Sequence, residues 1–175
     1  LFLESLKIHL GIYRLKKLLI ESLKKKELGI NLLDFNLRRL GLTKQSKICS
    51  ITHANCMDGT IAALILEQTF RNITCVSLKY DNQKDDSIRH YVESDKYDFV
   101  FLTDISPTDA DIIKDKNRAI LLDHHGSALY LHNPKENKYV IPDKFSGSSL
   151  TKRFIEEYFG LPLKHLTKLV KYSQD

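Results

Sequence analysis

The sequence contains no tryptophan, one methionine and only three cysteines in 175 residues. Cys49, Cys56 and Cys75 lie in or beside apolar runs and lack the paired spacing of zinc-binding motifs, so neither a zinc cage nor a disulfide framework is expected. A reducing, cytoplasmic compartment fits this cysteine content. No apolar run approaches the ~20 residues that a membrane-spanning helix needs, so we expect no membrane span.

The length and composition are those of a globular protein with one main domain and an appendage. A chain of this length can bury one core, and 42% hydrophobic with 28% charged residues is typical of such a protein. The net charge of +5 is unevenly distributed: residues 1–46 hold ten Lys/Arg against four Asp/Glu, and residues 47–175 hold seventeen against eighteen. The excess of basic residues therefore lies in residues 1–46.

Residues 1–46 are predicted to form a basic amphipathic helical extension. Leucines recur every three or four residues from 2 to about 26, and a second short helix is expected between Asn31 and Gly41. The lysines either contact nucleic acid or another anionic surface, or simply face solvent. The leucine faces would pack on the main domain, on a partner, or on a second copy in a homo-oligomer.

From Lys47 onward, strand and helix patterns alternate. Strands are expected at 48–52, 73–78, 99–102, 119–122 and 139–141. Helices are expected at 60–70, 87–92 and, as a short helix, near 109–114, with a helical turn near 128–131 and two more helices closing the chain from Ser146. Such alternation predicts an α/β fold, with a doubly wound parallel sheet and right-handed crossovers.

Polar side chains follow three of the predicted strands. The first strand runs into His53 and Asp58, the third into Asp104, and the fourth into Asp123-His124-His125. Each of these residues alone is more often a cap or turn residue, and Asp58-Gly59 is typical of a helix start. Because parallel strands end at the same edge of a sheet, the three clusters are expected to converge in one crevice.

Mixed imidazole and carboxylate groups in one crevice favour a transition-metal site. They suit Mn²⁺, Co²⁺ or Fe²⁺, and Mg²⁺ less well. Several neighbouring acids repel one another unless cations neutralise them, so two metal ions are expected rather than one. Two-metal sites activate water for in-line phosphoryl displacement, which predicts phosphoester hydrolysis.

The segment from His53 to Gly59, His-Ala-Asn-Cys-Met-Asp-Gly, together with the strand that leads into Asp123-His124-His125, resembles the DHH phosphoesterase superfamily. That superfamily includes RecJ-type exonucleases, oligoribonuclease-like phosphohydrolases and inorganic pyrophosphatases. The resemblance covers about residues 47–175. It implies the N-terminal catalytic domain of a phosphodiesterase that acts on short oligonucleotides, dinucleotides or single-stranded nucleic acid.

Site roles follow from the resemblance residue by residue. It implies metal ligation by His53 at the first metal, Asp58 and His124 at the second, Asp104 at both, and Asp175 as the family's last aspartate. His125 would contact the scissile phosphate, and Asp123 would orient the histidines; these two form the catalytic pair. From the residues alone, Ser146 and Ser148 could bind phosphate at a helix N-terminus, although plain capping explains them equally well.

The chain departs from the family pattern in two ways. Cys56 stands where many relatives have an aspartate, which leaves three alternatives open. The first metal site is weak, or Cys56 binds the metal and favours Zn²⁺ or Fe²⁺, or Cys56 packs beneath the loop. The glycine-rich C-terminal substrate-binding domain is absent, and both ends look cut, so a truncated chain is expected. The alternatives are a catalytically impaired binding or regulatory module and a pyrophosphatase-like phosphohydrolase.

Overall fold

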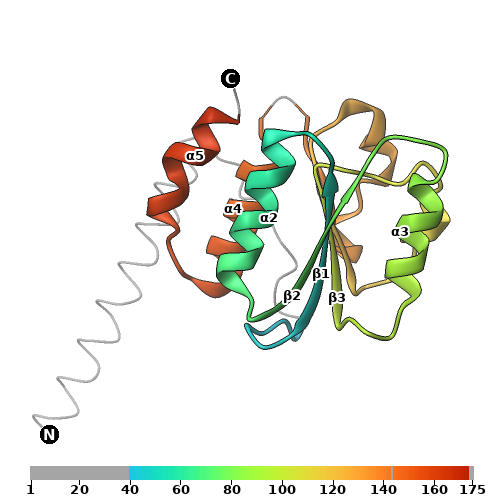
Figure 1. Ribbon diagram of the computed structural model, residues 1–175, viewed down its shortest axis with the longest axis horizontal. Coiled ribbons are helices and arrows are strands. Elements are labelled where there is room, and N and C mark those ends of the chain that lie inside the picture. The colour runs from blue at the N-terminus through green and yellow to red at the C-terminus, as the bar shows by residue number, and fades with distance from the viewer. Residues whose placement is uncertain (1–39, 143, 174–175) are drawn as a thin grey trace, which may run out of the picture. The chain divides into compact units, whose positions relative to one another are not determined.

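The computed structural model describes residues 40–142 and 144–173, and within these ranges it contains one five-stranded parallel sheet (Figure 1). The sheet order is β2-β1-β3-β4-β5. The strands are β1 (Lys47–His53), β2 (Asn72–Leu78), β3 (Phe99–Thr103), β4 (Ala119–Asp123) and β5 (Lys138–Val140). Every pairing between neighbouring strands is parallel, which confirms the predicted α/β fold.

Helices connect the strands and cover both faces of the sheet (Figure 1). The α-helices are α2 (Met57–Thr69), α3 (Lys84–Glu93), α4 (Gly147–Phe159) and α5 (Thr167–Tyr172). Short 3₁₀ turns are η2 (Ala110–Ile112), η3 (Gly126–Leu131), η4 (Pro134–Glu136) and η5 (Lys164–Leu166). Helices α2 and α4 lie on one face and α3 on the other, as expected for a doubly wound sheet.

The central strands are apolar because both of their faces are buried. Every residue of β3 and β4 is buried. On the α4 side, the Phe101 ring lies 5.8 Å from the rings of both Phe70 and Phe154. On the other side, Ile88 and Val92 of α3 join the core cluster that contains alternate residues of β1, β3 and β4. This two-sided burial explains the unbroken apolar runs in the sequence.

Strand register brings the ends of β1, β3 and β4 together. Thr103, the last residue of β3, pairs with Thr52 on one side and Leu122 on the other. The next backbone N–H, that of Asp104, donates to the carbonyl of Leu122 at 3.1 Å. Residues that follow these three strands therefore meet at one edge, the top edge in Figure 1.

The helix boundaries differ modestly from the sequence expectations. Helix α2 begins at Met57, three residues earlier than the apolar spacing indicates, because Cys56 takes the N-cap position. Helix α4 ends at Phe159, and Gly160 at its C-cap has a φ of 64°, the left-handed conformation expected there. The helices predicted before residue 40 lie outside the described residues. No helix in the described ranges has the length and hydropathy to cross a bilayer.

Candidate metal centre

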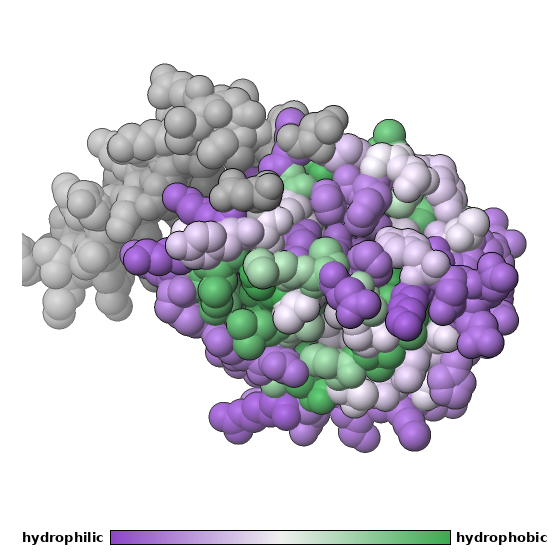
Figure 2. Space-filling model, turned by 45° about the horizontal axis from the view of Figure 1, so that its top comes forward, coloured by the Kyte–Doolittle hydropathy of each residue, from purple (hydrophilic) through white to green (hydrophobic). Residues whose placement is uncertain are grey.

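The sheet edge collects the polar side chains that the sequence places after three strands. His53 ends β1, Asp104 follows β3, and Asp123 ends β4 with His124 and His125 directly after it. Figure 2 turns this edge toward the viewer and shows apolar side chains exposed among hydrophilic ones on that face. The predicted convergence of residues about seventy positions apart is thus present in the fold.

Asp104 is shared by two groups of side chains that could hold a metal ion. One group is His53, Cys56 and Asp104, and the other is Asp104, His124 and His125. Within each group, the ligand atoms lie within 4.8 Å of one another. One carboxylate common to two three-residue groups is the arrangement that a bridged pair of cations requires.

The environment of Asp104 fits a cation. Its side chain is buried, with 1% of the residue exposed, and Oδ1 lies 3.1 Å from His124 Nε2. The other oxygen, Oδ2, is buried without a hydrogen-bond partner. Because a buried carboxylate oxygen without a partner is costly, a positively charged ligand at this position would compensate it.

The backbone at Asp104 is also unusual. Its φ is 59°, in the left-handed region that Asp and Asn tolerate better than most side chains. Gly59 and Gly147 allow the neighbouring helices to approach closely: a Cβ at Gly59 would lie 2.2 Å from the hydroxyl of Thr52, and one at Gly147 would lie 2.7 Å from Asp104 Cβ. Gly59 closes the motif that begins at His53, but sequence reasoning gave neither glycine this packing role.

Asp58 connects the site to the start of α4. Its carboxylate accepts hydrogen bonds from the backbone N–H groups of Gly147 at 2.5 Å and Ser148 at 2.9 Å. Asp58 Oδ2 also lies 3.6 Å from His124 Nε2. The first-turn donors of α4 hold the negative charge favourably, and a carboxylate keeps acceptor capacity beyond two hydrogen bonds. Ligation of the second metal by Asp58 stays a prediction.

Asp123 holds His125 in a fixed orientation. Asp123 Oδ1 lies 2.7 Å from His125 Nδ1 and accepts from the backbone N–H groups of His124 and His125. Ser106, a residue that sequence reasoning missed, donates its hydroxyl to Asp123 Oδ2. A His125 tautomer protonated at Nδ1 leaves Nε2 available as an acceptor or a metal ligand.

The charges of this cluster shift several pKa values. Burial acts to raise the pKa of Asp123, but hydrogen bonds from His125 and Ser106 outweigh it and lower that pKa. The hydrogen bond to Asp104 raises the pKa of His124, and the bond to Asp123 raises the pKa of His125. Both imidazoles therefore retain protons more readily than usual, and a cation would compete with these protons.

Cys56 lies in the ligand group rather than in the core. It is half-buried at the N-cap of α2, and its side chain makes no capping hydrogen bond. Burial and the neighbouring Asp104 carboxylate both raise the pKa of the Cys56 thiol. Its distance from the other two side chains would allow it to take part in the site, and ligation by Cys56 stays a prediction.

The serines at the start of α4 cap that helix. Ser146 accepts from the backbone N–H of Ser149, and the Ser149 side chain accepts from the backbone N–H of Ser146. The hydroxyl of Ser148 lies 3.1 Å from that of Ser146 and 2.7 Å from that of Ser173. Substrate binding by Ser146 and Ser148 stays a prediction, and Asp175 lies outside the described residues.

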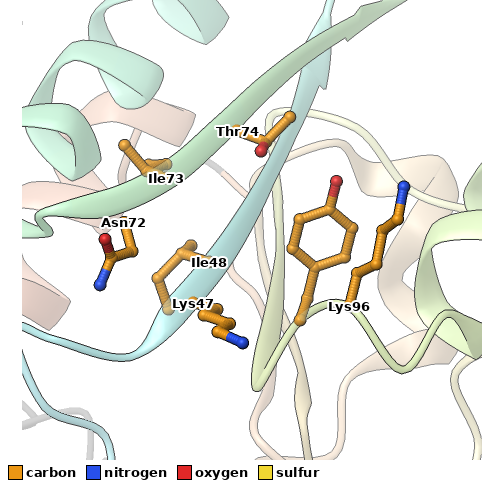
Figure 3. Close-up of a pocket in the computed structure, with 7 residues that line it drawn as sticks. Lys47, Ile48, Asn72, Ile73, Thr74 and Lys96 are labelled. Carbon is orange, nitrogen blue, oxygen red and sulfur yellow. The ribbon is translucent and has the colours of Figure 1, made fainter.

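A cavity lies at the opposite edge of the sheet, where the strands begin (Figure 3). Its volume is about 530 Å³, and its polar lining includes Lys47, Asn72, Thr74 and Lys96. It contains none of the side chains predicted for the metal centre.

Comparison with known proteins shows a shared fold. No family model matches the sequence, and no curated protein matches it. The chain is similar to the crystal structure of an uncharacterized protein from Helicobacter pylori G27, with a TM-score of 0.56, 18% sequence identity and coverage of 71% of this chain. The match spans 40% of the length of that structure.

Proposed function

We propose that this chain is the catalytic part of a DHH-type, metal-dependent phosphodiesterase acting on short oligonucleotides, dinucleotides or single-stranded nucleic acid. The observation that carries the proposal is Asp104, a buried carboxylate shared by two ligand groups, with one oxygen lacking a hydrogen-bond partner. Asp58, Asp104 and Asp123 are all buried in this region. Their negative charge favours a cation over an apolar ligand.

The donor set supports two divalent metal ions, with Mn²⁺ as the first choice. Imidazole and carboxylate groups together suit Mn²⁺, Co²⁺ and Fe²⁺, while Mg²⁺ prefers oxygen ligands alone. When bound, the two ions would polarise water and neutralise charge on the phosphoryl oxygens.

His125 and Asp123 have the geometry of a substrate-orienting pair. Asp123 fixes the His125 ring through Nδ1 at 2.7 Å, which directs the other ring nitrogen away from this hydrogen bond. His125 is partly exposed beside the ligand groups, where it can donate to or accept from a phosphate oxygen. We therefore assign contact with the scissile phosphate to His125 and positioning to Asp123.

The proposal is tested by incubating the full chain with a dinucleotide, with and without Mn²⁺. Mononucleotide release that requires Mn²⁺ and falls at least about 100-fold in His124→Ala is the expected result. His165→Ala is the matched control, because His165 hydrogen-bonds to Gln68 and belongs to neither ligand group. Mn²⁺ binding without hydrolysis would instead indicate a binding module, and hydrolysis of pyrophosphate alone would indicate a pyrophosphatase.

A further inference from the structure

A small cavity opens beside His125 and borders the candidate centre, because Asp123 and His125 line it. Its volume is about 200 Å³, and Asp123 and His125 form one side of it. The loop after β2 and the start of α3 contribute Tyr80 and Lys84, and η3 contributes Tyr130. A group attached to a phosphate at His125 would have this space beside it.

Tyr130 presents an exposed aromatic ring at this cavity. The residue is 60% exposed, yet its hydroxyl donates to the backbone carbonyls of Pro107 at 3.1 Å and Thr108 at 2.7 Å. The hydroxyl end is therefore held in place while the ring remains accessible. A held, accessible ring loses little conformational freedom when a planar group stacks on it.

Tyr80 forms another wall, and its surroundings hold it in position. Its ring centroid lies 4.5 Å from that of His53 and 6.4 Å from that of His125, and Lys84 Nζ lies 5.0 Å from its centre. The tyrosine therefore contacts histidines that follow two of the three strands, His53 at the end of β1 and His125 after β4.

The ammonium group of Lys84, in the cavity wall, already has hydrogen-bond acceptors within the protein. Lys84 is buried, and its ammonium donates to the carbonyl of Ser106 at 2.7 Å and the hydroxyl of Thr108 at 3.3 Å, with Asp85 Oδ1 at 3.5 Å. Because these acceptors occupy its donors, Lys84 is poorly placed to bind a second phosphate. The cavity consequently offers aromatic surface to a ligand rather than free positive charge.

We propose that this cavity binds the nucleobase of the nucleotide whose phosphate lies at the candidate centre, with the base stacked on Tyr130 and Tyr80 forming the adjacent wall. The inference rests on the proposed function and refines its substrate class, since inorganic pyrophosphate has no group that uses an aromatic wall. Stacking on one aromatic side chain corresponds to about tenfold in affinity.

Binding of AMP and of ribose 5-phosphate to the full chain in Mn²⁺, measured by calorimetry, tests this inference without turnover. We expect AMP to bind about tenfold more tightly. Tyr130→Ala is expected to abolish this preference and Tyr130→Phe, which keeps the ring, to retain it. Tyr172→Ala is the control, because Tyr172 is an exposed tyrosine on α5 outside the cavity.

The outcomes separate this inference from the proposed function. Equal affinity for AMP and ribose 5-phosphate, absence of AMP binding, or a preference that survives in folded Tyr130→Ala would overturn the nucleobase site. Hydrolysis of a dinucleotide with no such preference would overturn the site and leave the proposed function standing. A preference for AMP without any hydrolysis would leave the nucleobase site standing and overturn the proposed function.

Discussion

Gly147 packs directly against Asp104, because a Cβ atom at position 147 would lie 2.7 Å from Asp104 Cβ and 3.1 Å from its Cα and backbone nitrogen. The backbone N–H of the same glycine donates to Asp58. The first residue of α4 thus contacts two of the acidic residues of the candidate metal centre. The absence of a side chain at this position allows the helix to begin there.

Gly147→Ala is expected to disturb both the fold and the site. The added methyl group must displace α4 or the backbone of Asp104, which we expect to lower the free energy of unfolding by about 1–3 kcal/mol and to weaken Mn²⁺ binding. Urea denaturation and calorimetry measure these effects. Gly126→Ala is the matched control, because a Cβ there would meet nothing within 4 Å. Equal behaviour of the two variants would contradict the close-packing argument.

Asp104→Asn is expected to remove metal-dependent stabilisation. Asparagine keeps the shape of the side chain and tolerates the φ of 59°, but it lacks the charge that a cation requires. At a Mn²⁺ concentration 100 times the dissociation constant, the wild-type chain should gain about 2.7 kcal/mol per bound ion, and the variant should gain nothing.

Asp104→Ala provides the comparison for the backbone at this position. Alanine is less tolerant of the left-handed conformation, so this variant should be about 1 kcal/mol less stable than Asp104→Asn in the presence of chelator. Thermal melts with and without Mn²⁺ give both numbers. Mn²⁺ stabilisation that persists in Asp104→Asn would argue against a cation at Asp104.

The sequence predicts which residues meet at the edge of the sheet, because each strand and the acid that follows it can be recognised from neighbouring residues. The apolar runs that become β3 and β4 are unbroken, and an acid follows each, Asp104 one residue after the β3 run and Asp123 directly after the β4 run. The parallel topology then requires that Asp104, His124 and His53 lie close together. The α/β fold and the collection of these residues at one edge were therefore predictable.

Other parts of the site depend on contacts between distant segments, which the sequence does not reveal. Asp58 accepts from Gly147, 89 residues further along the chain. Ser106 donates to Asp123, 17 residues away, and carries no motif that marks it as a partner of the histidine pair. The wall formed by Tyr80 depends on how the loop after β2 folds back over His53.

Cys56 is expected to set the metal preference of the first ligand group. A thiolate is a softer ligand than a carboxylate, so Cys56→Asp should raise the affinity for Mn²⁺ relative to Zn²⁺ by about tenfold or more. Competition between the two ions, followed by calorimetry, measures this ratio. An unchanged ratio would show that Cys56 does not bind the metal. Cys75→Ser is the control, because Cys75 lies on β2 outside both ligand groups.

Lys138 is expected to make stability depend on alkaline pH. The residue is 2% exposed, its ammonium donates to the carbonyls of Lys116 and Glu136, and burial lowers its pKa to about 8. Since its usual value is 10.5, the unfolded chain binds more protons between about pH 8 and 10.5. The contribution of Lys138 to the free energy of unfolding therefore rises with pH across this window.

Lys138→Met should reduce that rise, while Lys114→Met, at an exposed position, should leave it unchanged. Urea denaturation at half-unit pH intervals compares the three slopes. Parallel slopes for wild type and Lys138→Met would contradict a lowered pKa for this lysine.

The central claim, that one buried carboxylate bridges two cations, is tested most directly by the stoichiometry of Mn²⁺ binding to the full chain, measured by calorimetry together with electron paramagnetic resonance. The expected result is two ions per chain that are magnetically coupled, with one ion lost in His53→Ala, the other lost in His124→Ala, and both lost in Asp104→Asn. A wild-type chain that binds one ion or none, or an Asp104→Asn variant that still binds two, would contradict the shared role of Asp104.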